Sequence, residues 1–364
     1  MASPAPRNSR ASLSALARHA VSAAAAAAAL AFAPPAAAAM AHSVADAQSP
    51  PSDTAYRQLV QAAKAVVGVK VRALPDARSN ETLGQEREGS GVLIGEEGGK
   101  DSLVLTMGYL VQEADQVQVT DSDGQTVPAS IVAADDATGF ALLKPLGPLA
   151  PKPIRVGTSA AVGQLDRLMI VSGGDAQAIS IATVVSRRPF AGYWEYLLDD
   201  AIFTAPPRLD HSGAALINKD GELVGIGSLF VMDALKSGEK LPGNMFVPID
   251  LLKPAIGEMV RTGGRRASHR PWLGVDSLEE DGRVKVMQVS DESPAAKAGL
   301  KAGDIILFID GVPVESLAHF YRVMWKSGPP GVDVRLTVLQ GPEVRELTVR
   351  SIDRQDFMRH KPAV

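Results

Sequence analysis

The feature that most constrains the fold of this chain is a long succession of short β-branched segments separated by turn residues. Examples are Val66–Val71, Val117–Val119 and Val127–Val132. Glycine and proline interrupt these segments, and Asp123-Gly124 and Asp220-Gly221 are typical of the tight turns in β-hairpins. This density of short strands predicts an all-β barrel or sandwich.

Further elements follow from the same patterns. Thr54 is expected to cap a helix over 55–66, and apolar spacing predicts a second helix over 249–261. More short strands are expected at residues 140–144, 167–171, 179–186, 201–204, 214–217 and 223–228. The predicted fold is therefore mostly β up to about residue 230.

The chain has 364 residues, which is more than one typical domain of about 100–200 residues. Its hydrophobic fraction of 46% and charged fraction of 21% are sufficient for packed cores. The Gly- and Arg-rich segment 262–271 is expected to be a linker. It would separate a β-rich domain at 54–261 from a second domain at 272–354, which a tail at 355–364 follows.

The N-terminus has the layout of a secretory signal peptide. Residues 1–41 contain Arg7, Arg10 and Arg18 but no acidic residue, and an alanine-rich apolar run and a small-residue cleavage site follow. That run is shorter than the roughly 20 residues of a membrane-spanning helix. We expect cleavage after Ala39 or Ala41, a Pro-rich linker at 42–53, and an exported, periplasmic protein with no remaining transmembrane span.

Several function classes are excluded by composition. The absence of cysteine excludes disulfides, thiolate metal sites and a cysteine nucleophile. A sequence without H-E-x-x-H or clustered ligand residues predicts no metal and no cofactor. The net charge of −4 gives no electrostatic reason to expect nucleic-acid binding.

Two sets of motifs resemble known families. Trp272-Leu-Gly-Val275, the stretch Glu292–Ile306 (ESPAAKAGLKAGDII) and Ile309-Asp-Gly311 resemble a bacterial-type PDZ domain. Upstream, Gly89-Ser-Gly-Val-Leu-Ile94 and Ser212-Gly213 occur in the order of HtrA/DegP-family serine proteases, as do Leu105-Thr106 and Phe140-Ala-Leu-Leu-Lys144. The resemblance implies a chymotrypsin-like double β-barrel followed by a PDZ domain. It also implies polypeptide substrates and a trimer formed through the protease domain.

The sequence departs from this family where the catalytic triad belongs. Tyr109 stands at the position of the family's histidine, and Gly139 stands at the position of its aspartate. The nucleophile position keeps Ser212, but Asp210 replaces the glycine of the oxyanion hole. Two of the three triad positions that the resemblance identifies are therefore lost.

These substitutions predict a protein without proteolytic activity. A serine hydroxyl needs an adjacent base, and a tyrosine with a pKa of about 10 is roughly 0.1% ionised at pH 7. Loss of triad members lowers the rate by about 10⁴–10⁶. An aspartate at position 210 would disfavour the positive φ that a glycine can adopt in the oxyanion hole. Its carboxylate would also repel the negative charge that develops in the transition state.

Nearby residues offer few replacements for the missing base or acid. His211 is adjacent to Ser212, but neighbouring side chains rarely face each other. Lys219 could form a Ser–Lys dyad, although its Asp-Gly turn suggests a solvated charge, and Asp135 or Asp136 could supply a displaced acid. None of these alternatives is favoured over a surface or loop role.

The PDZ-like segment keeps its binding elements. The resemblance implies that the amides of Leu273, Gly274 and Val275 hold a C-terminal carboxylate while the peptide pairs as an added strand. Apolar residues of the expected helix 316–326 would line the side-chain pocket, although they could equally be core residues: Leu317, Phe320 and Met324.

Three functional hypotheses remain. The first is an inactive protease homologue that binds C-termini or unfolded polypeptides in envelope protein quality control. The second is an active serine endopeptidase that acts through Ser212. The third is a regulatory subunit that assembles with an active paralogue.

Overall fold

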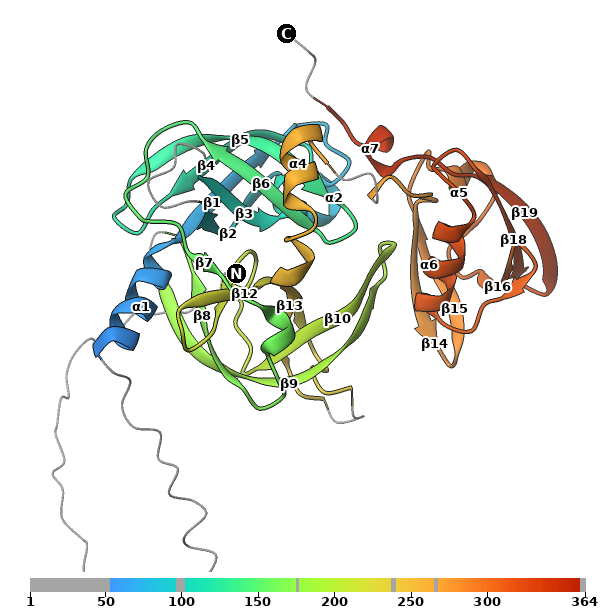
Figure 1. Cartoon of the computed structure of the whole chain (residues 1–364). Helices are drawn as coiled ribbons and strands as arrows, with labels where there is room; N and C mark the ends of the chain where they lie inside the picture. The colour runs from blue at the N-terminus through green and yellow to red at the C-terminus, as the bar shows by residue number, and fades with distance from the viewer. Residues whose placement is uncertain (1–52, 96–101, 175–176, 237–239, 265–267, 361–364) are drawn as a thin grey trace, which may run out of the picture. The chain divides into compact units, whose positions relative to one another are not determined.

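The computed structural model describes residues 53–95, 102–174, 177–236, 240–264 and 268–360 (Figure 1). The described residues form one compact unit. The expected signal peptide at 1–41 lies outside the described residues, as does the expected linker at 42–53 apart from its last residue. Within the described part of the chain, no helix combines the length and apolar character needed to cross a bilayer.

The first half of the unit is a closed six-stranded barrel with the strand order β1-β2-β3-β6-β5-β4. Alternating β-branched residues form these strands, as the sequence predicts. Helix α1 (Asp53–Lys64) precedes the barrel, and the single-turn helices α2 (Asn80–Leu83) and α3 (Gly108–Val111) interrupt it. The strands are β1 (Val66–Ala73), β2 (Glu86–Ile94), β3 (Leu103–Met107), β4 (Ala114–Thr120), β5 (Thr126–Asp135) and β6 (Phe140–Pro145).

A second sheet has the order β11-β8-β9-β10-β13-β12-β7. Strand β11 also pairs with β12, so six of these strands close into a second ring. The 3₁₀ turn η1 (Ser159–Ala161) follows β7. The strands are β7 (Arg155–Val156), β8 (Arg167–Ser172), β9 (Ala178–Gly192), β10 (Tyr196–Ala205), β11 (Ala215–Ile217), β12 (Glu222–Val231) and β13 (Gly243–Pro248).

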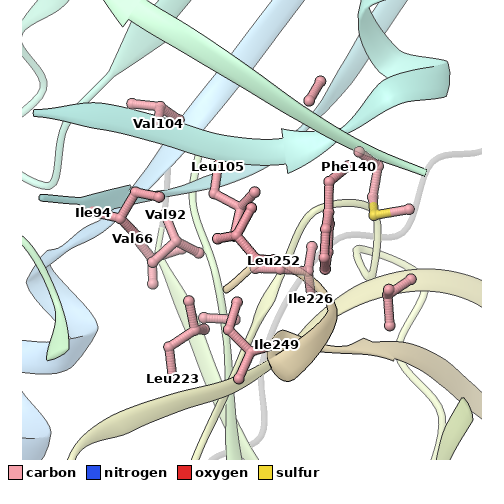
Figure 2. Close-up of a cluster of buried hydrophobic side chains, with 14 of the residues drawn as sticks. Val66, Val92, Ile94, Val104, Leu105, Phe140, Leu223, Ile226, Ile249 and Leu252 are labelled. Carbon is pink, nitrogen blue, oxygen red and sulfur yellow. The ribbon is translucent and has the colours of Figure 1, made fainter. Parts of the chain in front are cut away.

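One hydrophobic core joins the two barrels. Figure 2 shows Leu105 and Phe140 of the first barrel in the same buried cluster as Leu223 and Ile226 of the second. All four side chains are fully buried. Because buried side chains in protein cores are closely packed, this shared core holds the two barrels together.

The C-terminal part has its own sheet and its own core. Its strand order is β14-β15-β16-β18-β19, with β17 paired to β16, and β14 is an edge strand. Helix α6 (Leu317–Lys326) begins after Ser316, whose side chain accepts the N–H of His319 as an N-cap. The other elements are β14 (Val275–Glu280), β15 (Arg283–Val289), α5 (Pro294–Lys297), β16 (Ile305–Ile309), β17 (Val312–Pro313), β18 (Asp333–Gln340), β19 (Glu343–Arg350) and α7 (Arg354–Phe357).

Two helix predictions need correction. The helix expected over 249–261 is instead the 3₁₀ turn η2 (Ile249–Leu251) followed by α4 (Ile256–Thr262). Pro254 lies between them, where a proline ring disfavours a continuous helix. The first helix begins at Asp53 and ends at Lys64, because the residues from Val66 onward pair in the barrel.

Candidate functional site

Ser212 lies on a tight loop between β10 and β11. Its carbonyl accepts the N–H of Ser90 at 2.7 Å, which ties this loop to the first barrel. The next residue, Gly213, has a φ of 73°, and a Cβ there would lie 1.9 Å from the Ser90 carbonyl oxygen. Only glycine fits this approach of two backbones, so the loop fixes Ser212 at the junction of the barrels.

Tyr109 reaches this serine from α3, at the end of β3. Its hydroxyl donates to the Ser228 carbonyl at 2.8 Å. Burial raises the pKa of Tyr109 to about 12, although the nearby Ser212 side chain lowers it. The phenol therefore stays neutral at physiological pH and is a poor acceptor for the serine proton.

Gly139 lies beside the backbone of α3, just before β6. Its carbonyl accepts the N–H of Gly108 at 2.7 Å, and its φ is 80°. A Cβ at this position would lie 3.1 Å from Cε of Met107 and 3.3 Å from the hydroxyl of Tyr196. Residue 139, at the position of the family's aspartate, therefore carries no carboxylate, and its backbone conformation and close contacts favour glycine.

Gly139→Ala is expected to lower the free energy of unfolding by about 1–2 kcal/mol, because an L-residue is strained at positive φ. Gly124→Ala is the matched control, since Gly124 has a φ of 85° and a Cβ there would meet nothing within 4 Å. Urea unfolding would measure both. Because both variants carry the backbone strain, a Gly139→Ala protein that is no less stable than Gly124→Ala would contradict the tight fit at residue 139.

Asp210 does not present an open oxyanion site. Its carboxylate forms an ion pair with Arg208 and accepts from the hydroxyl of Ser172. Burial raises the pKa of Asp210, but the bonds from Arg208 and Ser172 outweigh this and hold it below its usual value. A carboxylate fixed here would repel a developing oxyanion.

The alternative bases and acids do not converge on Ser212. His211 is partly buried, its Nδ1 lies 3.1 Å from the Arg208 carbonyl, and burial lowers its pKa. Lys219 is exposed in the β11–β12 turn. Asp135 accepts from Thr138 at 2.5 Å, and Asp136 accepts from Gln355 at 2.7 Å.

A small cavity of about 170 Å³ lies beside the serine. Its lining includes Ser90, Gly173, Asp210 and Ser212, and Leu209, which is 87% exposed. Typical ligand pockets have about 300–1,000 Å³, so this cavity is smaller than a pocket for a drug-sized molecule. Among the described residues, no group of three potential metal ligands is found.

The Leu273–Val275 loop lies at the start of β14, and its three amides point at one carboxylate. Oε1 of Glu195 accepts from Gly274 at 2.8 Å and from Val275 at 3.0 Å. Leu273 lies 3.2 Å from each carboxylate oxygen. The loop thus holds a carboxylate of the same chain in this structure, and its role in holding the C-terminal carboxylate of a peptide remains a prediction.

The three helix residues expected to line a side-chain pocket lie in the hydrophobic core of the C-terminal part. Leu317 is 5% exposed, and Phe320 and Met324 are fully buried. The same helix carries Tyr321, whose hydroxyl lies 2.8 Å from the Gly192 carbonyl. A role for these residues in peptide selection remains a prediction.

Sequence reasoning missed the polar residues around these sites. The hydrogen-bond partners of these residues are distant in the sequence. Glu195 accepts from Gly274, Tyr321 donates to Gly192, and Arg208 donates to Ser172. The one available signal is the position of Glu195. It is the last residue of the turn between two long strands, where a glycine is common.

Comparison with known proteins agrees with this architecture. Residues 89–226 match the family model of the trypsin-like peptidase domain, and residues 271–350 match that of the PDZ domain. The serine endoprotease DegS of Haemophilus influenzae is 30% identical over 303 residues, which cover 79% of this chain and 84% of that protein. A Halomonas elongata protein named probable periplasmic serine endoprotease DegP-like is 30% identical over 74% of this chain and 57% of its own length.

Among solved structures, a variant of the HtrA-type protease AlgW with a tripeptide has a TM-score of 0.51. It is 23% identical, and the match covers 85% of this chain and 98% of that one. This likeness shows the fold. A trypsin-like double barrel followed by a PDZ domain defines a class of serine proteases and their homologues.

Within that class, this chain belongs to the HtrA family with a C-terminal PDZ domain.

Proposed function

We propose that this chain is a catalytically inactive HtrA-family protein that binds C-termini or unfolded segments of polypeptides through its PDZ domain. The observation that carries the proposal is the neutral phenol of Tyr109, which stands at the position of the family's histidine and donates to the Ser228 carbonyl. Gly139 supplies no carboxylate, and Asp210 occupies the oxyanion region. The loss of these catalytic groups is expected to lower the rate of peptide hydrolysis by about 10⁴–10⁶-fold.

The peptide-binding half of the proposal rests on the PDZ domain. Its edge strand β14 and the amides of Leu273–Val275 are suited to pair with an extended peptide and hold its carboxylate. We infer a trypsin-like domain at 54–261, a PDZ domain at 272–354 and an exported, periplasmic location. Relatives named as periplasmic proteases support that location.

The test is casein degradation by the purified mature protein, with Ser212→Ala alongside and a fluorophosphonate probe for the serine. We expect neither cleavage nor labelling in either protein, while an active HtrA relative assayed in parallel gives both. Cleavage that disappears in Ser212→Ala would overturn the proposal in favour of an active endopeptidase and make His211 the next residue to mutate. Co-purification with an active paralogue would instead indicate a regulatory subunit.

A further inference from the structure

The β9–β10 hairpin ends in an unusual turn. Gly192 pairs with Tyr196, which leaves Tyr193, Trp194 and Glu195 as the connecting residues. Glu195 has a φ of 59°, a region that glycine usually occupies in such hairpins. A residue held in a disfavoured conformation needs surrounding contacts to keep it there, and such positions concentrate at functional sites.

Those contacts come from the PDZ domain. The Glu195 side chain is buried, and it accepts all three amides of the Leu273–Val275 loop. Gly274 has a φ of 82°, which allows the successive amides to converge on one point. Several backbone donors on one carboxylate are what a PDZ domain offers to the end of a peptide chain.

The backbone of the hairpin tip continues the resemblance to a bound peptide. The Tyr193 carbonyl accepts the N–H of Ser277 on the edge strand β14 at 2.9 Å. On the opposite side, the Tyr321 hydroxyl of α6 lies 2.8 Å from the Gly192 carbonyl and accepts the Glu195 N–H at 3.2 Å. The tip therefore lies between the strand and the helix that border a PDZ peptide groove.

Apolar side chains complete the contact. Ala191 and Leu197, which face each other across the hairpin, pack against the buried core of the PDZ domain. The tip supplies a carboxylate and a backbone acceptor, and the two strands that flank it supply apolar side chains; these are the three components of a peptide ligand.

We propose that the tip Tyr193–Glu195 is a resident ligand of the PDZ domain, and that a peptide with a free C-terminal carboxylate binds only by displacing it. This inference rests on the proposed peptide-binding function. It defines the competing partner by its chemistry, an α-carboxylate on an apolar C-terminus. It also links peptide binding to release of the β9–β10 hairpin.

The test measures the Kd of a fluorescein-labelled peptide that ends in three valines, by anisotropy, with the full mature chain. Glu195→Gly removes the carboxylate but retains a residue that favours the turn, so the hairpin is preserved. We expect the peptide to bind at least about tenfold more tightly to this variant, because the site is no longer occupied by an internal competitor. Asp200→Asn, which removes an exposed carboxylate of the same hairpin, is expected to leave the Kd unchanged.

The outcomes separate the two proposals. If the carboxylate peptide binds the wild type and Glu195→Gly equally, the resident-ligand proposal is wrong while peptide binding stands. If it binds neither protein, or if a C-terminally amidated peptide binds as well as the carboxylate form, the proposed PDZ function fails.

A second experiment does not depend on the strength of peptide binding. The chain has no cysteine, so the double variant Tyr193→Cys, Ser277→Cys contains only two thiols. The backbones of these two residues are joined by a hydrogen bond in the structure. Oxidation is expected to form a disulfide that abolishes peptide binding, and dithiothreitol is expected to restore it. A pair that does not form, or an oxidised protein that still binds the peptide, would contradict a tip docked in the groove.

The pH dependence offers a further check. Burial raises the pKa of Glu195 to about 7, while the amides of the PDZ loop and the charge of Arg354 lower it; Arg270 and Tyr321 also face this carboxyl. The docked carboxyl thus holds its proton to a higher pH than a free one, so docking weakens as the pH rises from the ordinary carboxyl pKa to about 7. The ratio of the wild-type Kd to the Glu195→Gly Kd should fall over the same range.

Discussion

Replacing Glu113 with alanine is expected to lower the free energy of unfolding by about 3–5 kcal/mol, because several buried donors would lose their acceptor at about 1–3 kcal/mol each. Glu113 is 9% exposed and has a φ of 54°. Its carboxylate accepts the N–H of Ser79 at 2.8 Å, the N–H of Arg78 at 3.1 Å and the N–H of Arg359 at 2.7 Å. It thereby joins the segment after β1 to the C-terminal end of the described chain.

The loss would be large because Glu113 also balances a buried cation. Arg87 is 5% exposed; burial lowers its pKa, and the charge of Glu113 raises it. Alanine would leave this guanidinium without its counter-charge and would leave three backbone donors without their acceptor. The backbone strain at residue 113 would be unchanged, since alanine also carries a Cβ.

Urea unfolding measures the effect, and Glu81→Ala is the matched control. Glu81 is an exposed carboxylate on the neighbouring helix α2, so its removal should change stability by no more than about 0.5 kcal/mol. A loss below about 1 kcal/mol for Glu113→Ala would show that this network does not support the fold.

Lowering the pH should reduce the free energy of unfolding of the wild type by part of the same amount, because it protonates Glu113. Burial raises the pKa of Glu113, but hydrogen bonds from Ser79, Arg359 and Arg78 outweigh it, and the pKa lies below the ordinary value. The contribution of Glu113 is therefore present above the ordinary carboxyl pKa and is lost as the pH falls through the lowered one. The Glu113→Ala protein should lack this component of the acid transition.

The sequence predicted the fold well because its signals are local. Alternation of β-branched residues and Asp-Gly turns marks individual strands, and long motifs such as Glu292–Ile306 identify the PDZ domain without reference to the rest of the chain. The family shown by the comparisons confirms the resemblance. The prediction of one helix over 249–261 is wrong because the apolar spacing continues across Pro254, whose ring disfavours helical backbone at the preceding residue.

The contacts of the candidate site were much less accessible to sequence reasoning. The substitutions Tyr109 and Gly139 are visible from the motifs, but the positive φ of Gly139 and its contact with Tyr196 depend on packing between strands. Glu195 is 78 positions before Leu273, and nothing local to Tyr-Trp-Glu indicates a carboxylate that will meet three amides. Contacts of this kind form only after both elements are folded, so periodicity contains no information about them.

Tyr109→His alone is expected to give no Ser212-dependent activity. A histidine at this position would have the right chemistry for a base, but residue 139 has no carboxylate to orient it, and an orienting carboxylate accounts for about 10⁴ in rate. The carboxylate of Asp210, held by Arg208 and Ser172, would also repel the oxyanion that develops in the transition state.

Adding Gly139→Asp is expected to reduce stability rather than restore activity, because the new Cβ would meet Met107 and Tyr196 in a backbone at positive φ. Fluorophosphonate labelling of Ser212, followed by mass spectrometry, measures the result in the wild type, in Tyr109→His and in Tyr109→His with Gly139→Asp. Each protein is compared with the same background carrying Ser212→Ala. Labelling of Ser212 in the single Tyr109→His variant would mean that the loss of the histidine alone inactivated this chain, and that the surrounding site still supports catalysis.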